Sequence, residues 1–160
     1  MNKLEWIPEM ALGIPEIDAS HQRFLAKFNA IAAAPDLEFA LRFFAMTEEI
    51  ESGFRQEEAL MESADFYDIT LHRQQHARLL RALHRAAPDV LNGDFNAARQ
   101  TLRTLPKWFL FHLASMDKKI SVWLHLKTTE MTLDRIVGIQ NHGVIRHEGL
   151  HRHDTDQPPA

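Results

Sequence analysis

The chain has 160 residues, 45% of them hydrophobic and 25% charged, which are the size and composition of one globular domain. Its formal net charge of -4 argues against a protein that grips nucleic acid through a basic surface. Cysteine is absent and ten histidines are present. Disulfides, thiolate metal sites and cysteine nucleophiles are therefore excluded, and any metal ion must be held by nitrogen and oxygen atoms.

Apolar residues recur at intervals of three and four, which predicts helices through most of the chain. After an extended segment over residues 1–17, Asp18 is placed to cap a first helix. A second helix is expected from about residue 36 to 63, with Leu37 and Leu41 among its inward-facing residues. The segment between these two helices is interrupted by a proline, which restarts the chain.

The third and fourth expected helices are separated by turn-forming residues. The third begins after a turn near residue 70 and is expected to end at a break marked by Pro88 and the Asn92–Gly93 pair. Asp94 is placed to cap the fourth helix, which reaches about residue 127. Pro106 lies inside that pattern and is expected to kink or split the helix.

Four helices joined by short breaks predict an all-α fold, an antiparallel up-and-down four-helix bundle with an extended N-terminal segment. Residues 1–127 are interpreted as one domain. From residue 128 the periodicity fades, so residues 128–160 are expected to form a mostly irregular tail with a short helix around residues 129–139. The first residues lack a signal-peptide pattern and no apolar run approaches the roughly 18 residues of a membrane helix, so a cytoplasmic protein without membrane contact is expected.

Residues of the types that bind metal ions occur on all four expected helices. They are His21 on the first, Glu57 and Glu58 on the second, His72 and His76 on the third, and His112 and Asp117 on the fourth. Most have core-type neighbours, and a polar group on an inward face costs several kcal/mol unless it is paired or coordinated. A shared metal site is therefore predicted. The alternative is a set of separate histidines, each with its own hydrogen bond.

Two spacings bear on that site. His72 and His76 are four residues apart, which places both imidazoles on one side of a helix, one turn apart. His112 and Asp117 are five apart, roughly 140° around an ideal helix. If the last two serve one site, the helix between them must widen locally or one side chain must reach sideways.

The order and spacing of these residues resemble the bacterial hemerythrins over about residues 6–125. The stretches that carry the resemblance are Trp6, Gly13 to Asp18 before His21, Phe54 with Glu57 to Met61, the His72 and His76 pair, and Trp108 with His112 and Asp117 to Lys119. The resemblance implies a four-helix bundle around two iron ions with an oxo or hydroxo bridge, which binds dioxygen reversibly. It also implies one iron on His72, His76 and His112, the other on His21, and bridging by Glu57 and Asp117.

Two positions depart from that family's pattern. The pattern has a histidine four residues before the first bridging glutamate, where this chain has Gly53. Three outcomes are open: a water or small anion fills the space beside Gly53, a distant group such as a tail histidine reaches in, or the second iron binds weakly. Phe109 stands where the family carries a leucine that lines the oxygen pocket, so its ring is expected to narrow the pocket or fill the space of the absent imidazole.

The resemblance implies a non-heme di-iron protein that binds dioxygen, or a related small ligand such as nitric oxide or peroxide. We expect an oxygen or redox sensor, or an oxygen-binding module, with fast autoxidation. The alternative is a di-iron enzyme with peroxidase-like, nitric-oxide-consuming or ferroxidase-like activity at the open iron. No catalytic residue is assigned, because no general acid or base beyond the ligands is evident. The stretch over residues 134–141 loosely resembles the start of diguanylate cyclase output domains, which is compatible with a signalling partner.

Overall fold

The computed structural model describes residues 3–144, and the side chains of residues 3–137. They fall into two compact units, one that ends at Leu124 and one that begins at His125. The helices are α1 (Pro15–Ala32), α2 (Asp36–Ser63), α3 (Ile69–Leu91), α4 (Asn96–His112) and α5 (Lys118–Val144), with a 3₁₀ turn at Pro8–Met10 and a π-helix at Leu113–Asp117. No strand occurs among the described residues, which confirms the all-α prediction.

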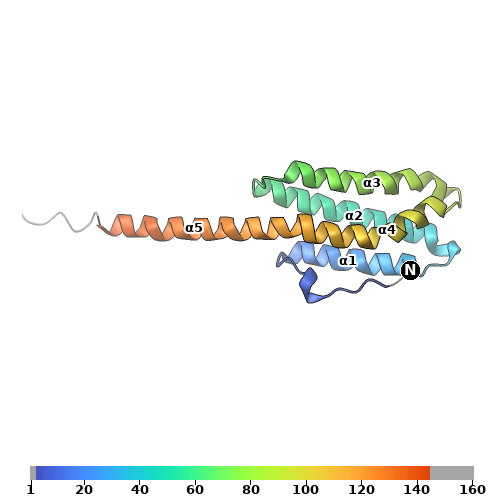
Figure 1. The fold of residues 1–160 in the computed structure, drawn as a ribbon, viewed down its shortest axis with the longest axis horizontal. Helices are drawn as coiled ribbons and strands as arrows, with labels where there is room; N and C mark the ends of the chain where they lie inside the picture. Colours follow the sequence, from blue (N-terminus) through green and yellow to red (C-terminus); the bar gives the residue numbers. More distant parts are fainter. Residues whose placement is uncertain (1–2, 145–160) are drawn as a thin grey trace, which may run out of the picture. The chain divides into compact units, whose positions relative to one another are not determined.

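Within the unit that ends at Leu124, α1 to α4 lie side by side in an up-and-down arrangement, with each helix in contact with the next along the chain (Figure 1). The connections are short, because neighbouring antiparallel helices need only a few residues to reverse direction. This is the expected four-helix bundle. Its core is lined by large apolar side chains that are almost completely buried: Phe28, Ile31, Phe39, Phe43, Met46, Leu83, Leu102 and Leu105.

The inward face of α2 differs from the expected one at its N-terminal end. Leu37 and Leu41 are 96% and 76% exposed, whereas Phe39 and Phe43 are fully buried. The two pairs are offset by two residues, which is roughly 200° around the helix. Phe39 and Phe43 are in helical phase with Gly53 and Glu57 further along, so the buried stripe runs straight from the bundle end to the level of the ligand-type residues.

Prolines interrupt the helices less than their positions predict. Pro88 lies inside α3, which continues to Leu91 and ends where Gly93 adopts a φ of +82°. Pro106 lies inside α4, which is continuous around it. A proline near a helix end removes one backbone hydrogen bond, and the last turn tolerates this loss. The Asn92–Gly93 pair, and not Pro88, therefore ends α3.

Asp18 is not the cap of the first helix, because α1 already begins at Pro15. Its carboxylate instead accepts hydrogen bonds from the backbone N–H groups of Leu12 at 2.8 Å and Gly13 at 3.1 Å. Gly13 has a φ of +75°, a conformation that favours glycine. Asp18 therefore holds the extended N-terminal segment against the first turn of α1.

The segment after residue 117 is helical over a longer range than expected. The short helix around residues 129–139 is part of α5, which runs without interruption from Lys118 to Val144. The remainder of the expected tail, residues 145–160, lies outside the described residues. The domain boundary after residue 127 stays a prediction. Between residues 3 and 144, no helix combines the length and the apolar character needed to cross a bilayer.

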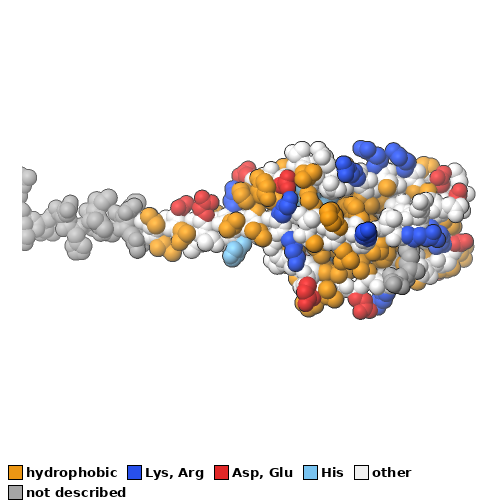
Figure 2. Space-filling model, in the orientation of Figure 1, with side chains coloured by type: hydrophobic (Ala, Val, Ile, Leu, Met, Phe, Trp, Pro, Cys, Tyr) orange, Lys and Arg blue, Asp and Glu red, His pale blue; other side chains and the backbone are white. Residues whose placement is uncertain are grey.

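Figure 2 shows one face of the bundle. Lys and Arg side chains gather over α3, and hydrophobic side chains extend over α1 and α4. On α4 the exposed apolar residues include Leu110 and Phe111, next to buried Phe109 and His112. The side of α4 that carries ligand-type residues therefore points into the bundle.

Candidate metal centre

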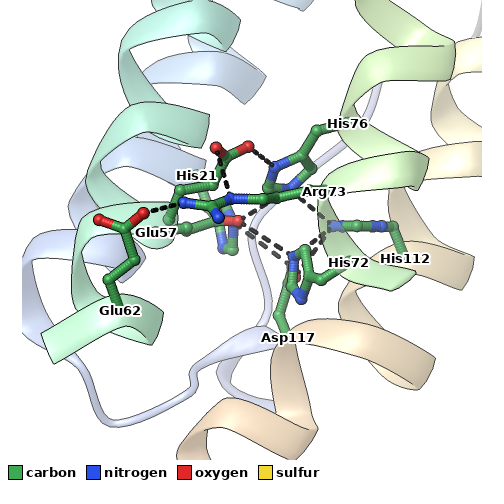
Figure 3. A network of polar contacts seen from close by, with 9 residues as sticks. His21, Glu57, Glu62, His72, Arg73, His76, His112 and Asp117 are labelled. Atoms are coloured by element: carbon green, nitrogen blue, oxygen red, sulfur yellow. Dashed lines mark hydrogen bonds and ion pairs between the residues drawn. The ribbon is translucent and has the colours of Figure 1, made fainter. Parts of the chain in front are cut away.

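The six predicted ligand residues lie together in one buried cluster (Figure 3). They come from every helix of the bundle: His21 from α1, Glu57 from α2, His72 and His76 from α3, His112 from the end of α4, and Asp117 from the π-helix. None of the six is more than 7% exposed. Ionisable side chains are seldom buried to this extent unless they are paired or coordinated.

The π-helix at Leu113–Asp117 explains how residues five apart share one site. A π-helix places residue i+5 where an α-helix places residue i+4, so the turn is wider. Here the imidazole Nε2 of His112 lies 3.1 Å from the carboxylate Oδ1 of Asp117. The widening that the spacing required is thus present, and the sideways reach is not needed.

The ligand atoms form two overlapping groups. One consists of Glu57, His72, His76 and His112, the other of His21, Glu57 and Asp117, and within each group the atoms lie within 4.8 Å of one another. In the first group three imidazoles converge. The Nε2 of His112 lies 3.0 Å from that of His72 and 3.2 Å from that of His76.

Two carboxylates face both groups at once. Glu57 Oε1 lies 3.1 Å from His21 Nε2, whereas its Oε2 lies 3.2 Å from His76 Nε2. Asp117 Oδ2 lies 3.6 Å from His21 Nε2, whereas its Oδ1 lies 3.1 Å from His112 Nε2. Each carboxylate therefore turns one oxygen toward each group, which is the arrangement needed to bridge two metal ions.

The cluster has buried polar atoms that the protein itself leaves unsatisfied. Five of them make no well-aligned hydrogen bond to the described residues: His21 Nδ1, His72 Nδ1, Glu57 Oε2 and both carboxylate oxygens of Asp117. Buried polar atoms normally have partners, and such an atom costs free energy when it has none. Imidazole and carboxylate are ligands that suit iron. The donor set therefore fits a metal site of the kind that holds iron better than a set of separate histidines.

Electrostatics keep the bridging carboxylates in their charged form. Burial tends to raise the pKa of Glu57, but three close imidazoles hold that pKa well below its ordinary value. Burial and the charge of Glu57 also tend to raise the pKa of Asp117, yet the imidazoles of two histidines lower it. For His72, burial opposes the charged form, but the carboxylates of Asp117 and Glu57 raise its pKa to about 9. The cluster thus holds anionic oxygens ready to offset buried positive charge.

Two further residues support the first group from outside. Glu58 Oε1 lies 2.9 Å from the Nδ1 of His76, and Arg73 Nε donates to the other oxygen of Glu58 at 3.2 Å. Arg73 also contacts Glu62 (Figure 3). A carboxylate on the outer nitrogen of a ligating histidine fixes the tautomer and orientation of its ring. Glu58 was recognised as part of the motif, but its partner 18 residues away could not be read from spacing.

Aromatic rings also hold two histidines of the first group. Phe54 stacks on His76 with ring centroids 3.6 Å apart and planes 5° apart. Trp108 stacks on His112 at 4.6 Å and 13°. Such contacts limit the rotation of both imidazoles and fix their Nε2 atoms in place.

The second group adjoins a small cavity of about 30 Å³, lined in part by Ser20, His21, Gly53 and Phe109. Phe109 packs edge-on against the ring of His21, with centroids 5.4 Å apart. Glu49 also lines the cavity, and its buried carboxylate accepts a hydrogen bond from Arg23 at 2.9 Å and lies 3.4 Å from Lys27 Nζ. Glu49 was not among the predicted site residues. Its position four residues before Gly53, on the stripe that leads to Glu57, is the signal that could have identified it.

Comparison with known proteins gives a consistent result. Residues 12–124 match the family described as hemerythrin HHE cation binding domain. A bacteriohemerythrin of Ralstonia nicotianae is 32% identical over 124 residues, which cover 78% of this chain and 90% of that protein. Crystal structures of hemerythrin in which one leucine is replaced by tyrosine or alanine are similar, with a TM-score of 0.70 and 19% identity over 78% of this chain and 98% of theirs. At that identity the structural likeness concerns the fold alone.

Proposed function

The chain belongs to the hemerythrin family, and from this premise we propose that it is a non-heme di-iron protein that binds dioxygen, or a related small ligand such as nitric oxide or peroxide, in the core of its bundle. The observation that carries the proposal is the orientation of Glu57 and Asp117, each with one oxygen toward each ligand group. A mononuclear site would not need two shared carboxylates. Two adjacent cations would, because the shared anions offset their repulsion in a buried site.

In this proposal His72, His76 and His112 hold one iron, His21 holds the other, and Glu57 and Asp117 are shared. The iron pair supplies the redox chemistry toward dioxygen, which amino-acid side chains do not provide. The protein supplies the ligands, their orientation and a site shielded from bulk water. Stacking by Phe54 and Trp108 and the carboxylate of Glu58 contribute the orientation.

The cavity beside the second group supports a small ligand. At about 30 Å³ it has room for one or two molecules the size of water, and a larger substrate would not fit. Apolar side chains form most of its wall, among them Phe24, Phe54, Leu79 and Phe109. A diatomic ligand fits this volume, and the aromatic wall limits the access of solvent.

The second group offers one imidazole and two shared carboxylates, and Gly53 adds no side chain. We infer that this iron keeps an exchangeable position next to the ligand, and that the oxygenated protein is converted quickly to the ferric state. Fast autoxidation suits an oxygen or redox sensor, or a short-lived oxygen-binding module, better than a storage protein.

Iron content per chain, together with the optical spectrum, tests the proposal most directly. Two irons with charge-transfer bands of an oxo-bridged pair are the expected result, and one iron or none would contradict it. The lifetime in air tests autoxidation separately. An oxygenated form that persists for hours would contradict the exchangeable position while leaving the di-iron centre intact.

A di-iron enzyme is the second candidate, and the placement of Glu49 favours keeping it. This carboxylate lines the cavity that adjoins His21 and Glu57, where a group that accepts or delivers a proton would have to lie. Its ion pairs with Arg23 and Lys27 hold it in place. Steady turnover of peroxide or nitric oxide, far faster than with free iron and lost in Glu49→Gln, would favour the enzyme over the binding module.

A further inference from the structure

Ser20 occupies the space into which a side chain at position 53 would project. A Cβ added to Gly53 would lie 2.6 Å from the Ser20 hydroxyl oxygen, closer than Cβ contacts occur in proteins. The Ser20 Cβ itself would be 3.9 Å away, an ordinary van der Waals distance. The conflict therefore concerns the hydroxyl group alone. Glycine at position 53 and the hydroxyl at position 20 belong together as one arrangement.

The Ser20 hydroxyl is not held by a hydrogen bond to another described residue. Ser20 is 3% exposed as a residue, but its hydroxyl oxygen is not one of the fully buried polar atoms that lack a partner, so the oxygen borders free space. Helical serines often satisfy their hydroxyl on the preceding turn. This hydroxyl instead lines the cavity with Gly53 and His21. It is thus a hydrogen-bonding group directed at a space large enough for a water molecule.

Five of the side chains that line the cavity are polar. Ser20, His21, Glu49, Glu57 and His112 contribute these polar side chains, whereas the remaining wall is mainly aromatic and aliphatic. A buried water needs about two to four polar partners and roughly 10–15 Å³ of free volume, and the cavity meets both conditions. An apolar cavity of the same size would stay dry.

We propose that Ser20 and Gly53 form a subsite for one water molecule next to the second ligand group, and that the Ser20 hydroxyl anchors this water. The inference rests on the proposed function, because the water would stand where the His21, Glu57 and Asp117 group lacks a further ligand. The same subsite accepts a small anion such as azide in exchange for the water. Ser20 is a positioning residue in this proposal and is not itself a metal ligand.

The first test is a high-resolution crystal structure of the protein as purified, whatever its iron content. We expect an ordered water within about 2.6–3.2 Å of Ser20 Oγ, in the cavity beside Gly53. A dry cavity would overturn the proposal. Iron occupancy of the same crystals is measured independently. A protein without two irons would contradict the proposed function, whereas the presence or absence of the water would still decide the proposal about Ser20.

The second test uses azide binding to the ferric protein. Ser20→Ala keeps the small volume but removes a donor to a negatively charged ligand, and such a hydrogen bond is stronger to an anion than to water. We expect the azide dissociation constant to rise by about tenfold while iron content is unchanged. Ser52→Ala is the matched control, because Ser52 adjoins Gly53 but does not line the cavity. A value for Ser20→Ala within twofold of the control would overturn the proposal.

Discussion

The two ligand groups share Glu57 and Asp117 but have very different surroundings. The first has three imidazoles, two of them stacked on aromatic rings, and a carboxylate on the outer nitrogen of His76. The second has one imidazole and lies beside the cavity at Gly53, which His112 of the first group also lines. In the proposed di-iron centre, the first group would retain its metal firmly, and the metal of the second group would exchange a small ligand.

With two irons held as proposed, this difference would divide metal retention and ligand exchange between two adjacent positions of one bundle. Rigid outer contacts raise metal affinity, since the ligands are already oriented before the metal binds. A missing ligand and a cavity lower affinity but admit a small molecule. Substitutions in the two groups should therefore have different effects on iron binding.

Glu57→Ala should abolish the distinction between the two groups, because both depend on this carboxylate. We expect iron content to fall close to zero, with the helical circular dichroism retained. Iron per chain, measured by elemental analysis after desalting, is the test. Glu62→Ala is the control, since Glu62 lies on the same helix and contacts only Arg73 among the residues of the network. Retention of a full iron by Glu57→Ala would show that the groups are independent.

His21→Ala and His76→Ala should separate the two groups. Without His21 the first group keeps all four of its ligand residues, so about one iron per chain should remain. Without His76 the first group loses an imidazole that Phe54 and Glu58 hold in place. We therefore expect the affinity for the first iron to fall by more than about 100-fold. Titration of the apoprotein with ferrous iron distinguishes the variants. Loss of the first iron in His21→Ala, together with its retention in His76→Ala, would contradict this assignment of the two groups.

Glu58→Gln should weaken iron binding by the first group without removing any of its four ligand-type residues. The amide cannot supply the negative charge that orients His76 and raises its basicity, so iron affinity should fall by roughly 10–100-fold. Competition with a chelator measures the change. Glu62→Gln is matched to it, because Glu62 also pairs with Arg73 but does not contact a histidine. Equal effects of both changes would assign the role to Arg73 and not to Glu58.

Gly53→His tests the cavity beside the second group, and the effect of this change depends on Ser20. An added Cβ would meet the Ser20 hydroxyl at 2.6 Å, so the single change should cost about 1–3 kcal/mol of unfolding free energy through overpacking. Ser20→Ala in the same chain should recover part of that loss and let the imidazole enter, which slows autoxidation. Thermal unfolding and the decay of the oxygenated form measure the two effects. Additive stability changes would mean that residues 20 and 53 do not interact.

Much of the fold follows from the periodicity of the apolar residues and from the residues that begin and end helices. Pro35 and Asp36 mark the start of α2, and the structure begins the helix at Asp36. The choice between Leu37 and Phe39 for the core could not be made locally, since both faces of that segment are apolar and the contact of Phe39 with the distant Phe95 decides. The phase relation to Glu57 was available in the sequence and favours Phe39. Local sequence patterns therefore predicted the position of each helix along the chain better than the rotation of the helix about its axis.

The six ligand-type residues could be grouped from the sequence because each is polar on an otherwise apolar helix face. Their roles as ligands stay predictions. Pairs that join distant segments, such as Glu58 with His76 and Glu49 with Arg23, could not be found in this way, because a charged helical residue is usually solvated. The contact between Ser20 and position 53 was equally hidden, since nothing in the sequence reports the direction of a hydroxyl.

The π-helix makes the metal centre depend on chain length as well as on side-chain identity. If the turn relaxed to a normal α-helix with the same residues, everything after it would be rotated by about 100° relative to α4. Asp117 would then leave the cluster and Ile120 would leave the core. Deletion of one residue at Ala114 or Ser115, which face outward or lie half-buried, would instead restore the usual spacing of four residues and keep Asp117 near His112. The wide turn and the five-residue spacing are therefore one feature, and neither can change without the other.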